Sequence, residues 1–230
     1  MDMKDVLIIV PARGGSKGIK NKNIYPVNGK PLIVYTLDVA SKVDFDNDIA
    51  VSTDSKDIQD IVKSYEKVEI IRRPIELSGD TASTECALIH ALDYMRDKYG
   101  KEYRYVMTLQ PTSPLRKTET INNFFAEYIK NIGQFDAQLT LTEDRSDYWI
   151  NEGGSYKRLF PHAPRRRQER KPIYQENSAI YITKSSVLKA TNSVLGNNVN
   201  GYVISNEEGI DINSIEDIYY TEFLLNKKME

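Results

Sequence analysis

The sequence predicts an α/β fold of three layers with a mainly parallel sheet at its centre. Short apolar runs, which are typical of buried strands, alternate along the chain with amphipathic segments, which are typical of helices. This alternation favours β–α–β units with right-handed crossovers, and such units place consecutive strands in parallel. Because 230 residues with 40% hydrophobic content suffice for one core, we expect residues 1–230 to form a single domain.

Seven strands are expected, and each is a short apolar run that ends at turn-forming or polar residues. The first run, VLIIV, breaks at Pro11. The second ends in Thr53-Asp54, and the fourth precedes a turn that two prolines make rigid. In chain order the expected strands are residues 6–10, 48–53, 68–71, 105–109, 136–142, 179–183 and 202–205.

Five helices are expected, and most of them have a recognisable start. Pro31 suits a first helical position, and Ser55 and Thr118 are N-cap residues. Ser214 with Asp217 resembles a capping box for the last helix. Behind these starts, apolar residues recur at helical spacing over residues 31–43, 55–65, 83–95, 118–128 and 216–225.

The periodicity fails between residues 143 and 174. This stretch contains Gly153-Gly154 and the basic run 165–171, and it is too long for a structureless loop in a compact domain. We therefore expect an arm within the domain that contacts a partner subunit. The basic run has a plain interpretation as a solvated face and a functional one as a site for an anionic substrate or nucleic acid. A formal net charge of −2 disfavours nucleic acid.

Composition excludes several classes of protein. No apolar stretch approaches the roughly 20 residues that span a bilayer, so we expect no membrane partner. The first residues, MDMKDVLIIV, are too short and too acidic for a signal peptide. Cys86 is the only cysteine, which excludes an internal disulfide and a cysteine-type zinc site. We expect a reduced, cytoplasmic protein.

The loop after the first strand is the strongest candidate for a binding site. Residues 13–22 combine three glycines with four cations, Arg13, Lys17, Lys20 and Lys22. Backbone N–H groups at such a glycine bend, together with the Ser16 hydroxyl, suit a polyphosphate whose charge the cations neutralise. The loop matches neither a Walker A motif nor a dinucleotide-binding fingerprint. The plainer alternative is a glycine turn with solvated lysines.

Other polar clusters follow the carboxyl ends of further expected strands, where ligands bind to parallel sheets. They are Thr53-Asp54, Arg73-Pro74 and residues 110–116. Each has a plain interpretation as a helix cap or a rigid turn, and Asp54 is a second candidate acid. Their coincidence at one edge of the sheet favours a single site.

A candidate metal site lies near the C-terminus. In Ile210-Asp211-Ile212-Asn213, strand alternation places Asp211 and Asn213 on one face. One carboxylate and one amide oxygen suit Mg²⁺, which prefers oxygen ligands and retains substrate phosphates and waters. The alternative is a pair of turn and cap residues.

Taken together, these segments resemble the acylneuraminate cytidylyltransferases, the CMP-sialic acid synthetase family. The match runs through most of the chain. Its motifs are Ala12-Arg13, Ser16-Lys17-Gly18, Lys22-Asn23, Ser52-Thr53-Asp54, Arg73-Pro74, Asp80-Thr81-Ala82-Ser83, the run LQPTSPLR at 109–116, Arg167-Gln168, Asn177 with Ala179-Ile180-Tyr181, and Ile210-Asp211-Ile212.

The resemblance implies a nucleotide-diphospho-sugar-transferase type of fold and a homodimer in which the arm covers the partner's sugar site. It implies attack of a 2-keto-3-deoxy sugar acid on the α-phosphate of CTP, with Mg²⁺ as cofactor and pyrophosphate as leaving group. Arg13, Lys22 and Asp211 would be catalytic. The nucleotide would be bound by Arg13, Gly14, Ser16, Lys17, Lys22, Asn23, Arg73, Ala82 and Ser83, and the sugar by Gln110, Arg167, Gln168, Asn177 and Tyr181.

The chain departs from the family pattern at two places. Asn213 stands where the sialic acid enzymes have a second aspartate, and Asp147-Tyr148-Trp149 stands where a lysine near the sugar is expected. The substrate is therefore either a sialic acid or a related acid such as legionaminic or pseudaminic acid. Two other functions stay open: a nucleotidyltransferase for another nucleotide or a sugar 1-phosphate, and a nucleotide-binding relative without catalysis.

Overall fold

The computed structural model describes residues 2–16, 18–79 and 82–227, and a seven-stranded sheet forms the centre of this part of the chain. The order of the strands is β11-β7-β10-β6-β1-β4-β5. Only β10 runs antiparallel to its neighbours β6 and β7, so the mainly parallel sheet is confirmed. The strands are β1 (Asp2–Pro11), β4 (Asn47–Thr53), β5 (Val68–Arg72), β6 (Lys101–Leu109), β7 (Ala137–Asp144), β10 (Ile173–Lys184) and β11 (Val199–Ile204).

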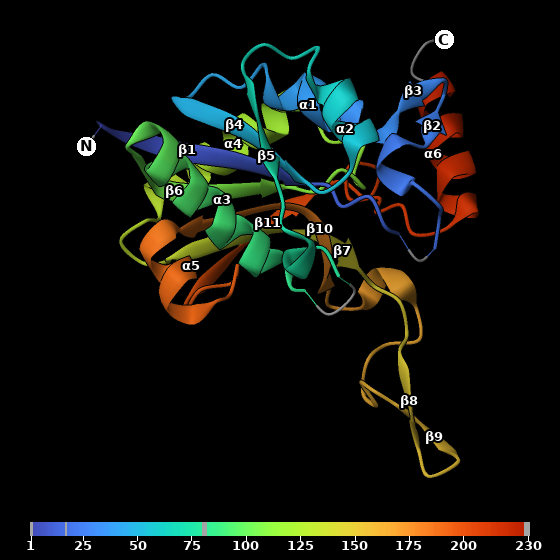
Figure 1. Ribbon diagram of the computed structural model, residues 1–230. Helices are drawn as coiled ribbons and strands as arrows, with labels where there is room; N and C mark the ends of the chain where they lie inside the picture. Colours follow the sequence, from blue (N-terminus) through green and yellow to red (C-terminus); the bar gives the residue numbers. More distant parts are fainter. Residues whose placement is uncertain (1, 17, 80–81, 228–230) are drawn as a thin grey trace.

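Helices cover both faces of the sheet, which gives the expected three layers (Figure 1). Alternate residues of β1 face opposite sides, as the pleat of a strand requires. Val6 and Ile8 pack in one core with α1, α2 and α4, whereas Leu7 and Ile9 pack in the other with α3 and α5. The helices are α1 (Leu32–Ala40), α2 (Lys56–Val62), α3 (Thr84–Tyr99), α4 (Thr118–Lys130), α5 (Ser185–Thr191) and α6 (Ile215–Lys227).

A third, smaller core lies beside the sheet at the site end of the molecule. Here α6 packs against the short hairpin of β2 (Pro26–Val27) and β3 (Lys30–Pro31). Ile19, Ile212 and Ile218 are buried together in this core. The loop that follows β1 is thus packed against the segment that carries Asp211, although the two are remote in the sequence.

Local signals predicted two of the four named helix starts correctly. Pro31 was expected at the first helical position, but it is the N-cap residue of α1, which begins at Leu32. The Ser55 hydroxyl accepts a hydrogen bond from the Ile58 N–H, and Ser214 and Asp217 form the expected capping box. The expected Thr118 cap is wrong. Lys117 occupies the cap position without a side-chain bond, while the Thr118 hydroxyl donates to the Val39 carbonyl, 3.1 Å away. A tertiary contact with the end of α1 replaces the local one.

The stretch with failed periodicity is an arm that extends from the body of the molecule (Figure 1). It contains a hairpin of β8 (Trp149–Glu152) and β9 (Ser155–Arg158), and its turn residues Gly153 and Gly154 have φ values of 62° and 91°. Such positive φ angles favour glycine. The basic run is partly structural, since Arg170 donates to the carbonyls of Arg145, Pro164 and Arg165.

No helix in the described part of the chain is both long enough and apolar enough to cross a membrane.

Candidate active site

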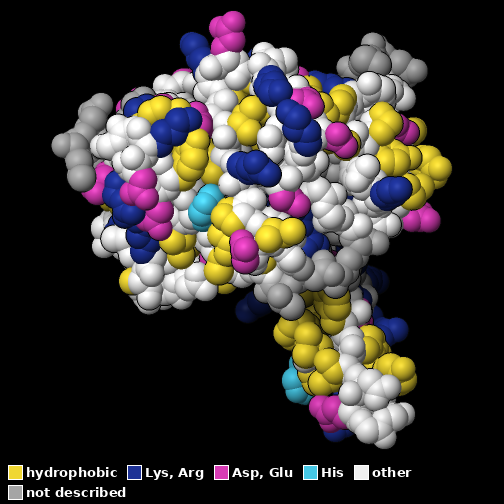
Figure 2. Space-filling view, viewed as in Figure 1, with side chains coloured by type: hydrophobic (Ala, Val, Ile, Leu, Met, Phe, Trp, Pro, Cys, Tyr) yellow, Lys and Arg dark blue, Asp and Glu magenta, His cyan; other side chains and the backbone are white. Residues whose placement is uncertain are grey.

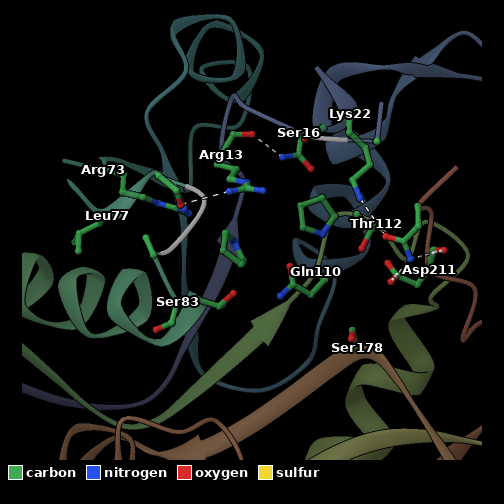
Figure 3. Close-up of a pocket in the computed structure, with 18 residues that line it drawn as sticks. Arg13, Ser16, Lys22, Arg73, Leu77, Ser83, Gln110, Thr112, Ser178 and Asp211 are labelled. Atoms are coloured by element: carbon green, nitrogen blue, oxygen red, sulfur yellow. Dashed lines mark hydrogen bonds between the residues drawn. The ribbon is translucent and has the colours of Figure 1, made fainter. Parts of the chain in front are cut away.

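A cavity of about 500 Å³ opens at the carboxyl ends of the central strands (Figure 3). Its walls come from the loop after β1, the segment after β5, the start of α3, the turn after β6, the bend in β10 and residues 211–213. Of the polar clusters that the sequence predicted at strand ends, those at Arg73 and Gln110 line this cavity, whereas Thr53 and Asp54 do not. The predicted site residues that line the cavity are Arg13, Ser16, Lys22, Asn23, Arg73, Ala82, Ser83, Gln110, Asp211 and Asn213.

Asn23 and Asp54 hold the loop after β1 in place. The sequence suggested other roles for them, a nucleotide contact for Asn23 and a candidate acid for Asp54. Asn23 is buried, and its amide donates to the Arg13 carbonyl at 2.9 Å. The Gly14 N–H donates to Asp54 Oδ1, also at 2.9 Å. Asp54 therefore anchors the loop. Gly14 does not line the cavity, although we predicted that it contacts the nucleotide. The prediction for Lys17 lies outside the described residues.

Gly18 allows the loop to approach residues 211–213 closely. A Cβ atom at Gly18 would lie 2.7 Å from the Asn213 backbone oxygen, whereas a Cβ at Gly15 would meet no atom within 4 Å. Such a short contact with backbone can be relieved only by moving one of the two segments. Gly18 thus sets the width of this side of the cavity.

Replacing Gly18 by alanine is expected to raise the KM for the nucleotide that the resemblance implies at least about tenfold and to lower the free energy of unfolding by about 1–3 kcal/mol, since overpacking displaces backbone. Steady-state kinetics and urea unfolding measure the two effects. Gly15→Ala is the matched control in the same loop, and it should stay close to the wild type in both. Equal behaviour of the two variants would contradict the close-approach argument.

Lys22 places a cation beside the Asp211 carboxylate. Its Nζ donates to the Ile212 carbonyl at 2.8 Å and to Asn213 Oδ1 at 3.5 Å. Burial lowers the pKa of Lys22, the nearby Asp211 charge opposes that shift, and the Arg13 charge adds to it. Asn213 in turn donates through Nδ2 to Asp211 Oδ2 at 2.8 Å. The carboxylate is therefore oriented by its neighbour.

Arg73 fixes a second positive charge in the wall. It is 7% exposed, and its guanidinium donates to the Ser52 hydroxyl at 3.1 Å and to the Ser52 carbonyl at 2.7 Å. Burial lowers the pKa of Arg73, against the effect of nearby Asp54. In Figure 3, Arg13 and Arg73 lie on one side of the cavity and Lys22 with Asp211 on the other, with Gln110 between them.

Arg116 ends the motif LQPTSPLR, and its role is visible only in the structure. Arg116 is 2% exposed and donates to the Ala179 carbonyl at 2.5 Å, to the Thr36 hydroxyl at 2.8 Å and to the Gln110 carbonyl at 3.3 Å. It ties the turn after β6 to β10 and thereby positions Gln110. Thr112 and Ser178 also line the cavity without having been predicted. Ser178 has a φ of 61°, which sequence alone does not signal.

The structure does not bring every predicted sugar-binding residue to this cavity. Asn177 is buried, and its side-chain oxygen accepts hydrogen bonds from the Thr140 hydroxyl and the Ala179 N–H. Tyr181 lines a neighbouring, smaller cavity. Arg167 lines another cavity beside β7, and Gln168 is exposed on the arm. Within one chain, these two arm residues do not reach the central cavity.

The donor set at Asp211 fits one type of metal site. Among the described residues, no group of three or more His, Cys, Asp or Glu side chains is placed to hold a metal ion. Zinc-like coordination by the protein alone is therefore not found in this part of the chain. Mg²⁺ needs only one or two carboxylates together with substrate phosphates and waters. Asp211, which lines the cavity together with Lys22, supplies the one carboxylate that such a site requires.

The fold and the cation-lined cavity at the carboxyl ends of the strands define a nucleotide-binding transferase. The chain belongs to the cytidylyltransferase family, whose model matches residues 7–211, and it is a nucleotidyltransferase of that family. The resemblance drawn from the sequence motifs is thereby confirmed.

Relatives of known activity support the same family. The chain is 30% identical to the CMP-N,N'-diacetyllegionaminic acid synthase of Legionella pneumophila over 98% of each chain. It is 31% identical to the N-acylneuraminate cytidylyltransferase of Streptococcus agalactiae over 93% of this chain, which spans only 52% of that relative. A solved CMP:2-keto-3-deoxy-manno-octonic acid synthetase complexed with CTP shares the fold, with a TM-score of 0.71, 16% identity and coverage of 97% and 99% of the two chains.

Proposed function

We propose that this protein joins CTP to a 2-keto-3-deoxy sugar acid of the nonulosonic type and releases the CMP-sugar and pyrophosphate. The observation that carries the proposal is the convergence of Arg13, Arg73 and Lys22 with Asp211 around one cavity. A triphosphate bears about four negative charges, and transfer of a nucleotidyl group depends mainly on positioning and on neutralising that charge. The activities named for its relatives belong to the same chemistry.

Arg13, Ser16 and Lys22 are proposed to hold the triphosphate, together with Lys17. Arg13 and Lys22 stabilise the charge that develops when the α-phosphate is attacked. Such electrostatic stabilisation is usually the largest single contribution to lowering the activation barrier. Asn23, Arg73, Ala82 and Ser83 are proposed to contact the rest of the nucleotide. The first turn of α3, which Ser83 caps, lies at that wall.

Asp211 is proposed to hold Mg²⁺, with Asn213 beside it as the second predicted ligand. The bound ion would supply charge neutralisation at the phosphates. The Asn213 amide orients the Asp211 carboxylate, and the capping carboxylate of Asp217 accepts hydrogen bonds from the N–H groups of Asn213 and Ser214. Burial raises the pKa of Asp217, but these bonds outweigh it and hold the pKa below its ordinary value.

The acceptor is proposed to enter beside Gln110 and to place its anomeric hydroxyl in line with the α-phosphorus. A bond forms between that oxygen and phosphorus, the bond to pyrophosphate breaks, and the hydroxyl proton leaves to solvent. Tyr181 and Asn177 belong to the sugar side, Asn177 through its place in the bend of β10. Arg167 and Gln168 are proposed to come from a partner's arm.

A homodimer is part of the proposal. The arm carries exposed apolar side chains, and Figure 2 shows them along most of its visible face. Exposed apolar clusters of this kind are typical of protein interfaces. They are Tyr148, Trp149, Ile150, Tyr156, Leu159 and Phe160.

We expect light scattering to give about twice the single-chain mass of 26.3 kDa for the wild type. Changing Trp149 and Tyr156, which are 53% and 68% exposed, to glutamate should give the single-chain mass, because charge in an apolar interface is costly. Tyr219→Glu is the control, since Tyr219 is 65% exposed and belongs to α6, which lies away from the β8–β9 hairpin (Figure 1). A dimer that survives the double change would contradict this use of the arm.

The proposed reaction is tested by pyrophosphate release with each of the four nucleoside triphosphates, Mg²⁺, and a panel of eight- and nine-carbon keto acids. Pyrophosphate together with a CMP-sugar should appear only with CTP and a keto acid. Release with a sugar 1-phosphate, or with another nucleotide, would favour the alternative transferase. Binding of CTP without any release would indicate a non-catalytic relative.

A further inference from the structure

Ser178 has an unusual backbone conformation at the edge of the site. Its φ is 61°, in the left-handed region that is unfavourable for residues with a Cβ atom. The other non-glycine residues with positive φ in the described part of the chain are Asn21, Asn28 and Asn192, and asparagine tolerates this region. A residue of another type persists there only where the surrounding structure fixes it, and such residues gather at active sites. Ser178 therefore needs a functional explanation.

Ser178 lies where two cavities meet. It lines the nucleotide cavity together with Gln110 and Asp211, and it also lines a smaller cavity of about 320 Å³ that contains Tyr181. Figure 3 shows Ser178 on the Gln110 and Asp211 side of the larger cavity, away from Arg73. Under the proposed function, the acceptor hydroxyl reaches the α-phosphate beside Gln110. Ser178 then borders the place where the new bond forms.

The Ser178 hydroxyl begins a chain of hydrogen bonds that ends at a carboxylate. The Tyr181 hydroxyl donates to Glu176 Oε1, which leaves the lone pairs of the tyrosine oxygen available to accept another bond. Ser178 Oγ lies 3.2 Å from that oxygen. Because the single Tyr181 proton cannot serve both bonds, Ser178 supplies the proton of the second. The lone pairs of Ser178 Oγ are then left to accept a proton from a group in the cavity.

A bulge in β10 makes this chain of hydrogen bonds possible. Five positions apart in a regular strand, Glu176 and Tyr181 would face opposite sides of the sheet. Here the register with β7 shifts between these two residues. Bulges re-aim side chains and are frequent beside active sites. Asn177 secures the bend, since its side-chain oxygen accepts hydrogen bonds from the Thr140 hydroxyl and the Ala179 N–H.

The surroundings of the chain of hydrogen bonds suit movement of a proton toward Glu176. Burial, and next the hydrogen bond to Glu176, raises the pKa of Tyr181, so the phenol stays neutral and can both donate and accept. Glu176 is exposed, so a proton that reaches its carboxylate can pass to solvent. No lysine or arginine is among the described residues that line the smaller cavity, and so none of them competes for that carboxylate.

We propose that Ser178 is a catalytic residue, and that Ser178, Tyr181 and Glu176 form a proton relay for the attacking hydroxyl. The acceptor oxygen bonds to the α-phosphorus, and pyrophosphate leaves with its electron pair. Meanwhile the hydroxyl proton passes to Ser178 Oγ, the Ser178 proton to Tyr181 and the Tyr181 proton to Glu176. Glu176 then releases its proton to solvent, which restores the carboxylate. Ser178 touches the reacting group, whereas Tyr181 and Glu176 act through it. This inference rests on the proposed function and gives the route by which the proton leaves.

The test measures the rate of the chemical step in a single turnover with CTP, Mg²⁺ and a keto acid that the wild type accepts. Ser178→Ala removes the hydroxyl and keeps the backbone strain, whereas Ser178→Gly removes both. Each should slow the chemical step about a hundredfold, as expected when general-base assistance is lost. The KM for CTP should stay within about twofold of the wild-type value, as for an interaction made only in the transition state. The Tm of Ser178→Gly should equal or exceed that of the wild type, because glycine adopts a positive φ without strain.

Glu176→Gln should slow the chemical step to a similar extent, since an amide does not take up the proton. The double variant Ser178→Gly with Glu176→Gln should be no slower than either single variant, because residues that act as a unit are not additive. Glu85→Gln is the matched control. Glu85 is the other carboxylate that lines the smaller cavity and is not part of the relay, so the rate of this variant should stay close to that of the wild type.

Three results would each overturn the relay. They are an unslowed chemical step in Ser178→Gly, losses that multiply in the double variant, and a loss in Glu85→Gln as large as that in Glu176→Gln. Slowing in Ser178→Ala without slowing in Ser178→Gly would assign the effect to the backbone and not to the hydroxyl. Failure of the wild type to release pyrophosphate with any keto acid would instead overturn the proposed function on which the relay depends.

Discussion

Replacing Lys22 by alanine is expected to lower kcat/KM for CTP by about two to three orders of magnitude, the size of effect seen when a contact to developing transition-state charge is lost. Lys22 is half-buried, and its Nζ is fixed by the Ile212 carbonyl at 2.8 Å, so the cation is preorganised before substrate arrives. A preorganised charge costs no reorganisation during the reaction. Arg13→Ala should have an effect of similar size, since Arg13 lines the same cavity.

Lys20→Ala is the control for Lys22, because Lys20 belongs to the same loop but is exposed and does not line the cavity. Its kcat/KM should stay within about twofold of wild type, as expected for a solvated surface charge. Thermal unfolding separates loss of folding from loss of catalysis. Near-wild-type turnover in both the Lys22 and Arg13 variants would refute the assignment of this loop to the triphosphate.

Removing the Asp211 carboxylate should abolish Mg²⁺-dependent turnover, with a loss of about a thousandfold or more, because no second acidic side chain is predicted as a ligand. Asp211→Asn keeps the shape and removes the charge, so it distinguishes charge from packing. The measurement is initial rate against Mg²⁺ concentration. Unchanged dependence on Mg²⁺ in Asp211→Asn would exclude Asp211 from the site.

Asn213 stands where the sialic acid enzymes have a second aspartate, and restoring that aspartate is a complementary experiment. Asn213→Asp places a second carboxylate beside Asp211, and we expect half-maximal rate at a severalfold lower Mg²⁺ concentration, since carboxylate ligands attract hard cations more strongly than amides. The Lys22 Nζ, 3.5 Å from Asn213 Oδ1, would help to tolerate the added charge. A higher requirement for Mg²⁺ would show that Asn213 only orients its neighbour.

Local patterns were enough to predict most strands of the sheet and that these strands run mainly parallel. β1 is buried on both faces, so its core positions must be apolar, and this produces the unbroken run VLIIV. Caps at Ser55 and Ser214 are equally local, since the partners lie three residues away. α2 and α5 both have seven residues, but α2 begins at the Ser55 cap, whereas Lys184 at the start of α5 makes no side-chain cap bond. α5 therefore escaped prediction, and its contacts with β6, β10 and α3 explain its place.

Some features of the candidate site follow from local sequence, and others depend on tertiary contacts. The sequence by itself determined which polar clusters follow strands, and the ends of parallel strands meet at one edge, so Arg13, Arg73 and Gln110 had to converge. Only the tertiary structure decided the approach of Gly18 to Asn213, the Arg116 contacts that hold Gln110, and the bend that joins Glu176 to Tyr181. These contacts join residues from separate segments, or depend on a bulge that breaks the two-residue period of a strand, and no local pattern records either.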